Sequence, residues 1–289
     1  MKKAFSLIEL SIVVLVIGIL TAGVIQGSIL VSNMRIQTAK SLTRSSPVNS
    51  IKDLSLWLEA ASVDSFDLTL DDASNPSSNS VNKWYDISPY MVKNHATAPE
   101  TNNKPTLTNN AVNGLPALLF DGTDDILNNA DLFTGSDISM FAVATNNAIT
   151  GGGYRRIISG YDDGYYYFGL SNGSDQFTTF YGDGSWVDLN ATFSGSATMY
   201  NIPKIYSSVL NGSENAGYIN GTSVGISTQS PGKKPYLTGY SVGSFSSSAT
   251  AQPWSGYIME IILINRAITT EERKSIESYL GQKWGIKVS

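Results

Sequence analysis

The amino-acid sequence predicts an N-terminal α-helix of transmembrane length, then an all-β jelly-roll sandwich that ends in a C-terminal helix. Three observations lead to this fold class. An uncharged apolar run extends from Leu10 to Val31. From residue 51 onward, short alternating or β-branched runs are separated by turn dipeptides. A single amphipathic pattern with clear boundary residues closes the chain. The breaker cluster at residues 45–50 divides a helix from a head at residues 51–289.

The composition restricts the possible functions. The chain of 289 residues has a formal charge of −5, no cysteine and a single histidine, His95. An acidic chain is a poor nucleic-acid partner, because that affinity comes largely from neutralising phosphates. The lack of cysteine excludes disulfides and thiolate zinc sites. One histidine, which we place in a loop, leaves little for acid–base or metal chemistry, so we predict a protein that is not an enzyme and needs no cofactor.

The apolar run from Leu10 to Val31 is long enough to cross a bilayer, and a chain in hydrocarbon must satisfy its backbone groups within a helix. A secretory signal peptide or a plain anchor would explain this run alone. Glu9 argues against both, because a carboxylate at the edge of an apolar segment is costly and a signal peptide has no use for it. Residues 32–44 continue the helix with polar side chains.

The start of the chain contains the run Ala4-Phe5-Ser6-Leu7-Ile8-Glu9-Leu10. These residues give it a resemblance to the prepilin processing motif of type IV pilins and type II secretion pseudopilins. It implies a leader at residues 1–4, cleavage between Ala4 and Phe5 by a prepilin peptidase, and N-methylation of Phe5. The mature helix would then be residues 5–44. It also implies that Glu9 pairs with the terminal amine of a neighbouring subunit, which fits the instability of an unpaired buried charge.

The head has the short strands and tight turns of an antiparallel sandwich. The predicted strands are Leu54–Glu59, Ser139–Thr145, Arg156–Gly160, Tyr165–Leu170, Gln176–Tyr181, Lys204–Leu210, Ala216–Ile219 and Tyr257–Ile264. Asx-Gly dipeptides between them, such as Asn220-Gly221, suit hairpins with positive φ. No strand–helix–strand alternation occurs, which argues against a nucleotide-binding parallel sheet.

The C-terminal helix has its own boundary signals. Thr269 and Glu272 fit a capping box, and Gly285 fits a C-terminal stop. The apolar residues between them share one face, which we expect to pack on the sandwich: Ile276, Tyr279, Leu280 and Trp284.

Several segments of the head carry recognisable short motifs: Leu56–Ala60, Val81–Asp86, Asn113–Ala117, Phe120–Asp125, Gly217–Gly221 and Trp254 through Gly285. Together, and in the same order along the chain, they resemble bacterial laminin-G-like, concanavalin-A-like domains. The resemblance implies the fold and not an activity, because this fold serves lectins, adhesins, spacers and glycoside hydrolases. Within these motifs we expect four tryptophans in the core: Trp57, Trp84, Trp254 and Trp284.

Two groups of side chains are candidate binding sites. Asp121, Asp124 and Asp125 form a carboxylate cluster of the kind that binds calcium, although an ordinary turn also explains them. Aromatic residues beside amides and carboxylates favour a sugar-binding groove, although alternating aromatics are also typical of a strand that faces a core. These candidates are Tyr165, Tyr167, Tyr181 and Trp186.

The sequence therefore predicts a pilin-like surface filament subunit, held in the inner membrane by one helix before it joins a pilus. Its β-sandwich head would lie outside the cytoplasm for adhesion or glycan binding. Its expected partners are prepilin peptidase, other pilin subunits and surface glycans. Two alternatives stay open: a pseudopilin of a type II secretion system, and a membrane-tethered glycan-acting enzyme.

Overall fold

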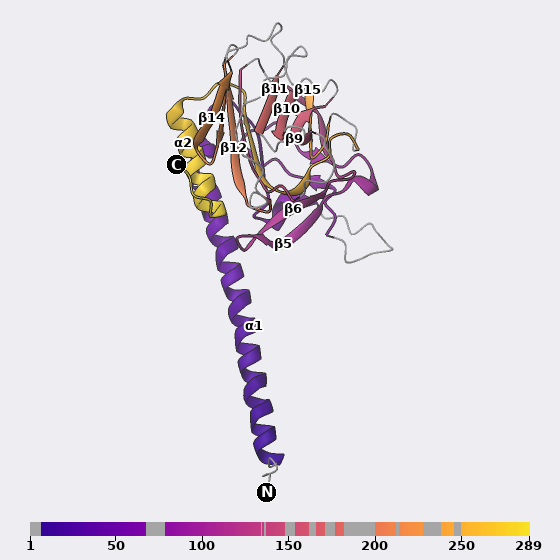
Figure 1. Ribbon diagram of the computed structural model, residues 1–289, viewed down its shortest axis with the longest axis vertical. Coiled ribbons are helices and arrows are strands. Elements are labelled where there is room, and N and C mark those ends of the chain that lie inside the picture. The colour runs from indigo at the N-terminus through magenta and orange to yellow at the C-terminus, as the bar shows by residue number, and fades with distance from the viewer. Residues whose placement is uncertain are drawn as a thin grey trace.

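We analysed a computed structural model of the full chain. It describes residues 7–67, 79–133, 135, 137–147, 154–161, 166–170, 177–181, 200–211, 214–227, 238–245 and 250–289. A long helix, α1 (Leu7–Arg44), projects from a β-rich head, and its N-terminal end lies far from that head (Figure 1). The segment after α1 is a 3₁₀ turn, Pro47–Ser50, whose Val48 is fully buried. The residues predicted as a linker thus pack against the head.

In the part of the chain that the structure describes, the head forms two eight-stranded antiparallel sheets, which we call sheet A and sheet B. Sheet A has the order β14-β13-β12-β8-β16-β6-β5, and β1 also pairs with β16. Its strands are β1 (Leu54–Glu59), β5 (Thr106–Val112), β6 (Leu115–Asp121), β8 (Ile138–Ala144), β12 (Lys204–Leu210), β13 (Asn215–Ile219), β14 (Thr222–Ser227) and β16 (Ser255–Ile264).

Sheet B has the order β11-β10-β9-β15-β7-β4-β3-β2. Its strands are β2 (Phe66–Asp67), β3 (Lys83–Trp84), β4 (Ala96–Thr97), β7 (Leu127–Phe133), β9 (Arg155–Gly160), β10 (Tyr166–Leu170), β11 (Phe177–Tyr181) and β15 (Thr238–Val242). Two further 3₁₀ turns, η2 (Val63–Ser65) and η3 (Thr101–Asn103), lie in the connections. The predicted β-sandwich is confirmed.

The core lies between the two sheets. Phe168 of β10 contacts Phe177 of β11, with ring centroids 5.0 Å apart, and Phe177 contacts Tyr206 of β12 in the opposite sheet at 5.2 Å. This aromatic chain crosses the sandwich and excludes water from it. The four tryptophans predicted as core residues are at most 1% exposed, as expected: Trp57, Trp84, Trp254 and Trp284.

The C-terminal helix α2 (Thr270–Trp284) covers the outer face of sheet A. Thr269 and Glu272 form the predicted capping box, and Gly285 ends the helix in the left-handed conformation at φ 67°. The apolar face of α2 is buried as predicted, because it packs against α1, the Pro47–Ser50 turn and β12. Strands of sheet A therefore have both faces covered, which explains why every residue of β8 is buried.

Candidate functional site

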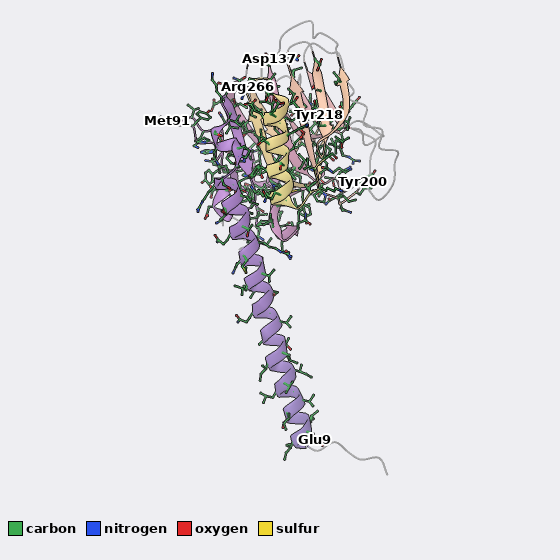
Figure 2. The ribbon with its side chains drawn as sticks, turned by 90° about the vertical axis from the view of Figure 1, so that its left-hand side faces the viewer. Glu9, Met91, Asp137, Tyr200, Tyr218 and Arg266 are labelled. Atoms are coloured by element: carbon green, nitrogen blue, oxygen red, sulfur yellow. The ribbon has the colours of Figure 1, made fainter. Side chains whose placement is uncertain are left out.

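The largest exposed apolar surface among the described residues is α1 itself. Its large apolar side chains from Leu7 to Val31 are each 48–84% exposed. By length and composition this helix is able to cross a membrane. Glu9 lies near the free end of α1, far from the head, as Figure 2 shows. A helix with apolar residues on all sides is stable only in lipid or among other helices, so this surface needs a partner.

Among the described residues, α1 packs on the head through its last turns. Ala39 is buried, and Ile36 and Leu42 are partly buried against the core. The three residues recur at helical spacing, so one stripe of α1 faces the sandwich. Lys40 reinforces the contact through an ion pair of 3.1 Å with Asp64, which lowers the pKa of that exposed carboxyl.

A buried charge cluster lies beneath this junction, and sequence reasoning missed it. Lys283 of α2 donates to Glu59 of β1 at 2.8 Å and lies 2.8 Å from Glu260 of β16. The strand register brings the two carboxylates together, because Glu59 and Glu260 are directly paired across β1 and β16. The signal in the sequence was a glutamate inside each of two otherwise apolar strands.

The two carboxylates of the cluster also accept hydrogen bonds from neighbouring side chains and backbone. Glu260 accepts from the indoles of Trp57 (2.8 Å) and Trp284 (2.7 Å) and from the hydroxyl of Tyr279 (2.8 Å). Glu59 accepts from the backbone of Ala61 and from a serine hydroxyl. Buried charges persist only with such partners, so we assign the cluster to holding β1, β16 and α2 together.

The two neighbouring carboxylates keep the Lys283 ammonium charged. Burial lowers its pKa, but the charges and hydrogen bonds of Glu260 and Glu59 outweigh burial and raise it above its ordinary value. Burial and the Glu260 charge also raise the pKa of Tyr279. The Tyr279 hydroxyl lies 3.4 Å from Thr43 of α1, so the cluster extends to the anchor helix.

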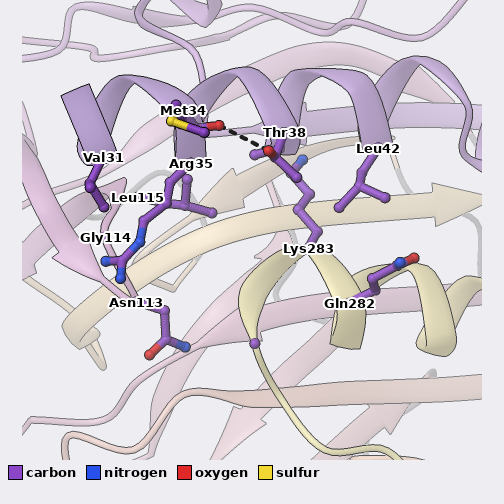
Figure 3. Close-up of a pocket in the computed structure, with 12 residues that line it drawn as sticks. Val31, Met34, Arg35, Thr38, Leu42, Asn113, Gly114, Leu115, Gln282 and Lys283 are labelled. Atoms are coloured by element: carbon purple, nitrogen blue, oxygen red, sulfur yellow. Dashed lines mark hydrogen bonds between the residues drawn. The ribbon is translucent and has the colours of Figure 1, made fainter.

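A groove of about 620 Å³ lies where α1 leaves the head (Figure 3). Its walls come from three elements: α1 with Val31, Met34 and Arg35, the β5–β6 turn at Gly114, and the end of α2 at Lys283. In Figure 3 the Arg35 side chain extends from α1 toward the β5–β6 turn. Gly114 has φ +84°, and a Cβ there would lie 2.4 Å from the Arg35 Nη1. Glycine thus leaves the space that Arg35 occupies.

The predicted carboxylate cluster does come together. One oxygen each from Asp121, Asp124 and Asp125 lies within 4.8 Å of the others. The turn uses two of the three internally, because Asp125 accepts from the Asp121 backbone at 2.7 Å and Asp121 accepts from Thr123. Burial raises the pKa of Asp125 to about 7, and the charges of its two neighbours add to this. The spacing suits a calcium ion, and the turn's own bonds also explain it.

His95 lies in a loop, as predicted. Its Nδ1 accepts a hydrogen bond of 3.0 Å from the backbone of Asp86. Asp86 in turn accepts from the backbones of Trp57 and Ser88. Burial lowers the pKa of His95. These bonds fix the loop after β3, which is a structural role.

The predicted sugar-binding aromatics are only partly described. Tyr167 and Tyr181 lie on the adjacent strands β10 and β11, where Tyr167 pairs with Phe180 and Tyr181 with Tyr166. The register therefore puts the two positions on opposite faces of sheet B and does not bring them together in one groove. Tyr165 and Trp186 lie outside the described residues, as do the processing residues Ala4 and Phe5.

Comparison with known proteins gives the fold but no family. No protein-family model matches the chain, and no curated protein matches it. Among solved structures, Trypanosoma rangeli sialidase in complex with sialic acid matches with a TM-score of 0.53 and 12% identity over 82% of this chain and 34% of that one. The same enzyme with a difluoro-KDN ligand gives a TM-score of 0.54 and 12% identity, over 89% and 39%.

A third structure is the binding domain of Paraclostridial Mosquitocidal Protein 1, with a TM-score of 0.53 and 13% identity over 81% of this chain and 55% of that one. The chain thus spans about a third to about half of the length of these three matched chains. These proteins share its fold. The fold occurs in glycosidases and in a binding domain, which alone assigns neither role to this chain.

Proposed function

We propose that this chain is a pilin-type subunit, anchored in the inner membrane by α1 and assembled into a surface filament through the same helix. The observation that carries the proposal is an apolar helix exposed along its length, with one carboxylate, Glu9, near its start. A simple anchor needs the apolar surface but not the carboxylate. The motif from Ala4 to Leu10 supports processing between Ala4 and Phe5.

In this proposal the amine released at Phe5 carries a positive charge that can pair with Glu9. In a filament the two groups would belong to different subunits, so a charge pair would form only when helices are in register. Gly18, Gly23 and Gly27 support close helix packing, because no atom lies within 4 Å of where their Cβ would be.

The head in this proposal is a non-enzymatic binding module, with surface glycans as its ligands. Similarity of fold to a sialidase and to a binding domain supports a glycan-related role. The buried carboxylate pair Glu59 and Glu260 is 3% and 0% exposed and is held by Lys283, so we do not assign it to glycoside hydrolysis, which needs carboxylates that reach the substrate.

Mass spectrometry of the protein from native membranes and from sheared surface fibres tests the proposal. We expect an N-methylated Phe5 terminus in both fractions. The variant Glu9→Gln should still be processed but should disappear from the fibres, whereas Glu100→Gln, an exposed acid in the head, should leave fibres unchanged. An intact Met1 or a start near Gly23 would contradict the pilin assignment. Processing without appearance in fibres would favour the pseudopilin alternative.

A further inference from the structure

The groove between α1 and the head lies at the depth of lipid headgroups if α1 spans the membrane as proposed. The uncharged run from Leu10 to Val31 is about 33 Å long as a helix, close to the roughly 30 Å of a bilayer's hydrocarbon core. Arg35 is one turn beyond Val31, or about 6 Å further along the helix axis. The headgroup region on each side of the core is roughly 5–8 Å thick. Arg35 and the groove therefore fall within it.

Arg35 presents a cation in this groove. Among the described residues, no carboxylate forms an ion pair with Arg35 and none lines the groove. Lys283 also lines it, whereas the two carboxylates that Lys283 binds do not. The Lys283 ammonium is buried against those carboxylates, so Arg35 is the cation that the described groove residues offer to a ligand.

The lining also matches the amphipathic shape of a lipid. Met34 is 61% exposed and Val31 50% exposed, and both lie on the membrane side of the groove, next to the apolar helix surface. Amide side chains lie on the head side, at Asn113 and Gln282. A bound lipid would lay its acyl chain along the apolar surface of α1 and its polar headgroup against Arg35 and the amide side chains.

We propose that this groove binds the headgroup of one anionic phospholipid, with its phosphate against Arg35. This inference rests on the membrane anchor of the proposed function. Gly114 is part of the site, because its missing side chain lets the guanidinium lie over the β5–β6 turn. A subunit that leaves the membrane for a filament must give up this lipid. The groove is thus a lipid-specific contact in addition to the apolar span.

Native mass spectrometry of the full chain in mild detergent, with equal amounts of phosphatidylglycerol and phosphatidylcholine, tests the proposal. We expect about fivefold preferential retention of phosphatidylglycerol, the contribution of one basic residue near an anionic surface. Arg35→Gln should bring the ratio to about one. Arg44→Gln removes an exposed arginine of the same helix that does not line the groove, so it should keep the wild-type ratio. Equal effects of the two variants would overturn the proposal.

Two further measurements keep the outcome interpretable. Met34→Glu places a carboxylate in the groove at an exposed position, so it should also abolish the preference while the thermal unfolding temperature stays unchanged. Because the chain has no cysteine, a single Thr38→Cys substitution reports on the alternative occupant, a second copy of this chain. A disulfide-linked dimer of the Thr38→Cys variant, formed without any lipid preference, would overturn the lipid site.

Flotation with neutral phosphatidylcholine vesicles separates this inference from the proposed function. A chain that floats but shows no phosphatidylglycerol preference keeps its membrane anchor and loses only the lipid site. A chain that does not float contradicts the anchor, and with it the position of the groove at the membrane surface.

Discussion

Replacing Lys283 by methionine is the sharpest test of how the head is held together. The substitution keeps the length of the side chain and removes the one ammonium between two buried carboxylates. Side-chain exposure is 0% for Lys283 and Glu260 and 4% for Glu59. Breaking a buried charge pair by removing one partner costs about 3–5 kcal/mol of folding free energy. Both carboxylates keep other donors, so we expect about 3 kcal/mol, the lower end of this range.

The loss should depend on pH in a defined direction. In the wild type the folded-state pKa of Lys283 is raised above 10.5. Its contribution is therefore complete below about pH 10.5 and is lost as the pH rises through the folded-state pKa. The raised pKa of Tyr279 acts in the same direction.

Urea unfolding of the full chain in mild detergent, followed by tryptophan fluorescence, measures this loss, because Trp57 and Trp284 are buried beside the cluster. Lys274→Met is the matched control, since Lys274 is an exposed residue of the same helix and should change stability by less than about 0.5 kcal/mol. Equal effects of the two substitutions, or a loss that does not change with pH, would refute the assignment of the cluster as a structural charge pair.

Three other perturbations have defined outcomes. Gly114→Ala forces a side chain onto a residue with φ +84° and into Arg35, so we expect a loss of about 1–2 kcal/mol in urea unfolding. Hydrogen bonds from Arg266 lower the pKa of Glu272 to about 2, so Glu272→Gln should cost about 1 kcal/mol at pH 7 and progressively less as the pH falls from about 4.5 toward 2. If the carboxylate cluster of Asp121, Asp124 and Asp125 binds calcium, about 2 mM calcium should raise the unfolding temperature by about 2–4 °C relative to the protein in a chelator. Asp124→Asn should abolish this rise. If calcium does not change the unfolding temperature, the cluster serves the turn alone.

The local signals of the sequence translated directly into structure. The run Leu54–Glu59 is β1 with the same bounds, and Lys204–Leu210 is likewise β12. Asn220 and Gly221 have φ of 50° and 84°, as expected for the hairpin between β13 and β14. These features depend on neighbouring residues, so a sequence window contains all the information that specifies them.

The polar strands were missed because their stabilisation comes from elsewhere. β5 is an edge strand with largely exposed or half-exposed side chains, and β7 carries adjacent asparagines, Asn128 and Asn129, that suggest a loop. Both strands form because neighbouring strands supply their hydrogen bonds. The cluster of Glu59, Glu260 and Lys283 was missed for the same reason, since only the sheet register and the packing of α2 bring these residues together.

The arrangement of the helices favours one face of the head for ligand binding. α1 contacts β6, α2 contacts β12, and both strands belong to sheet A (Figure 1). A filament built around α1 would therefore bring sheet A toward its axis and leave sheet B, with β10 and β11, on the outside. A glycan array with the full chain in detergent should then give binding that Tyr167→Ala removes, because strand alternation puts position 167 on the face opposite to the core residue Phe168. An exposed position on the opposite sheet, Ile226→Ala, should leave binding unchanged. Binding that survives Tyr167→Ala would move the ligand site away from this strand, and absence of binding by a correctly folded chain would make the head a protein-contacting module.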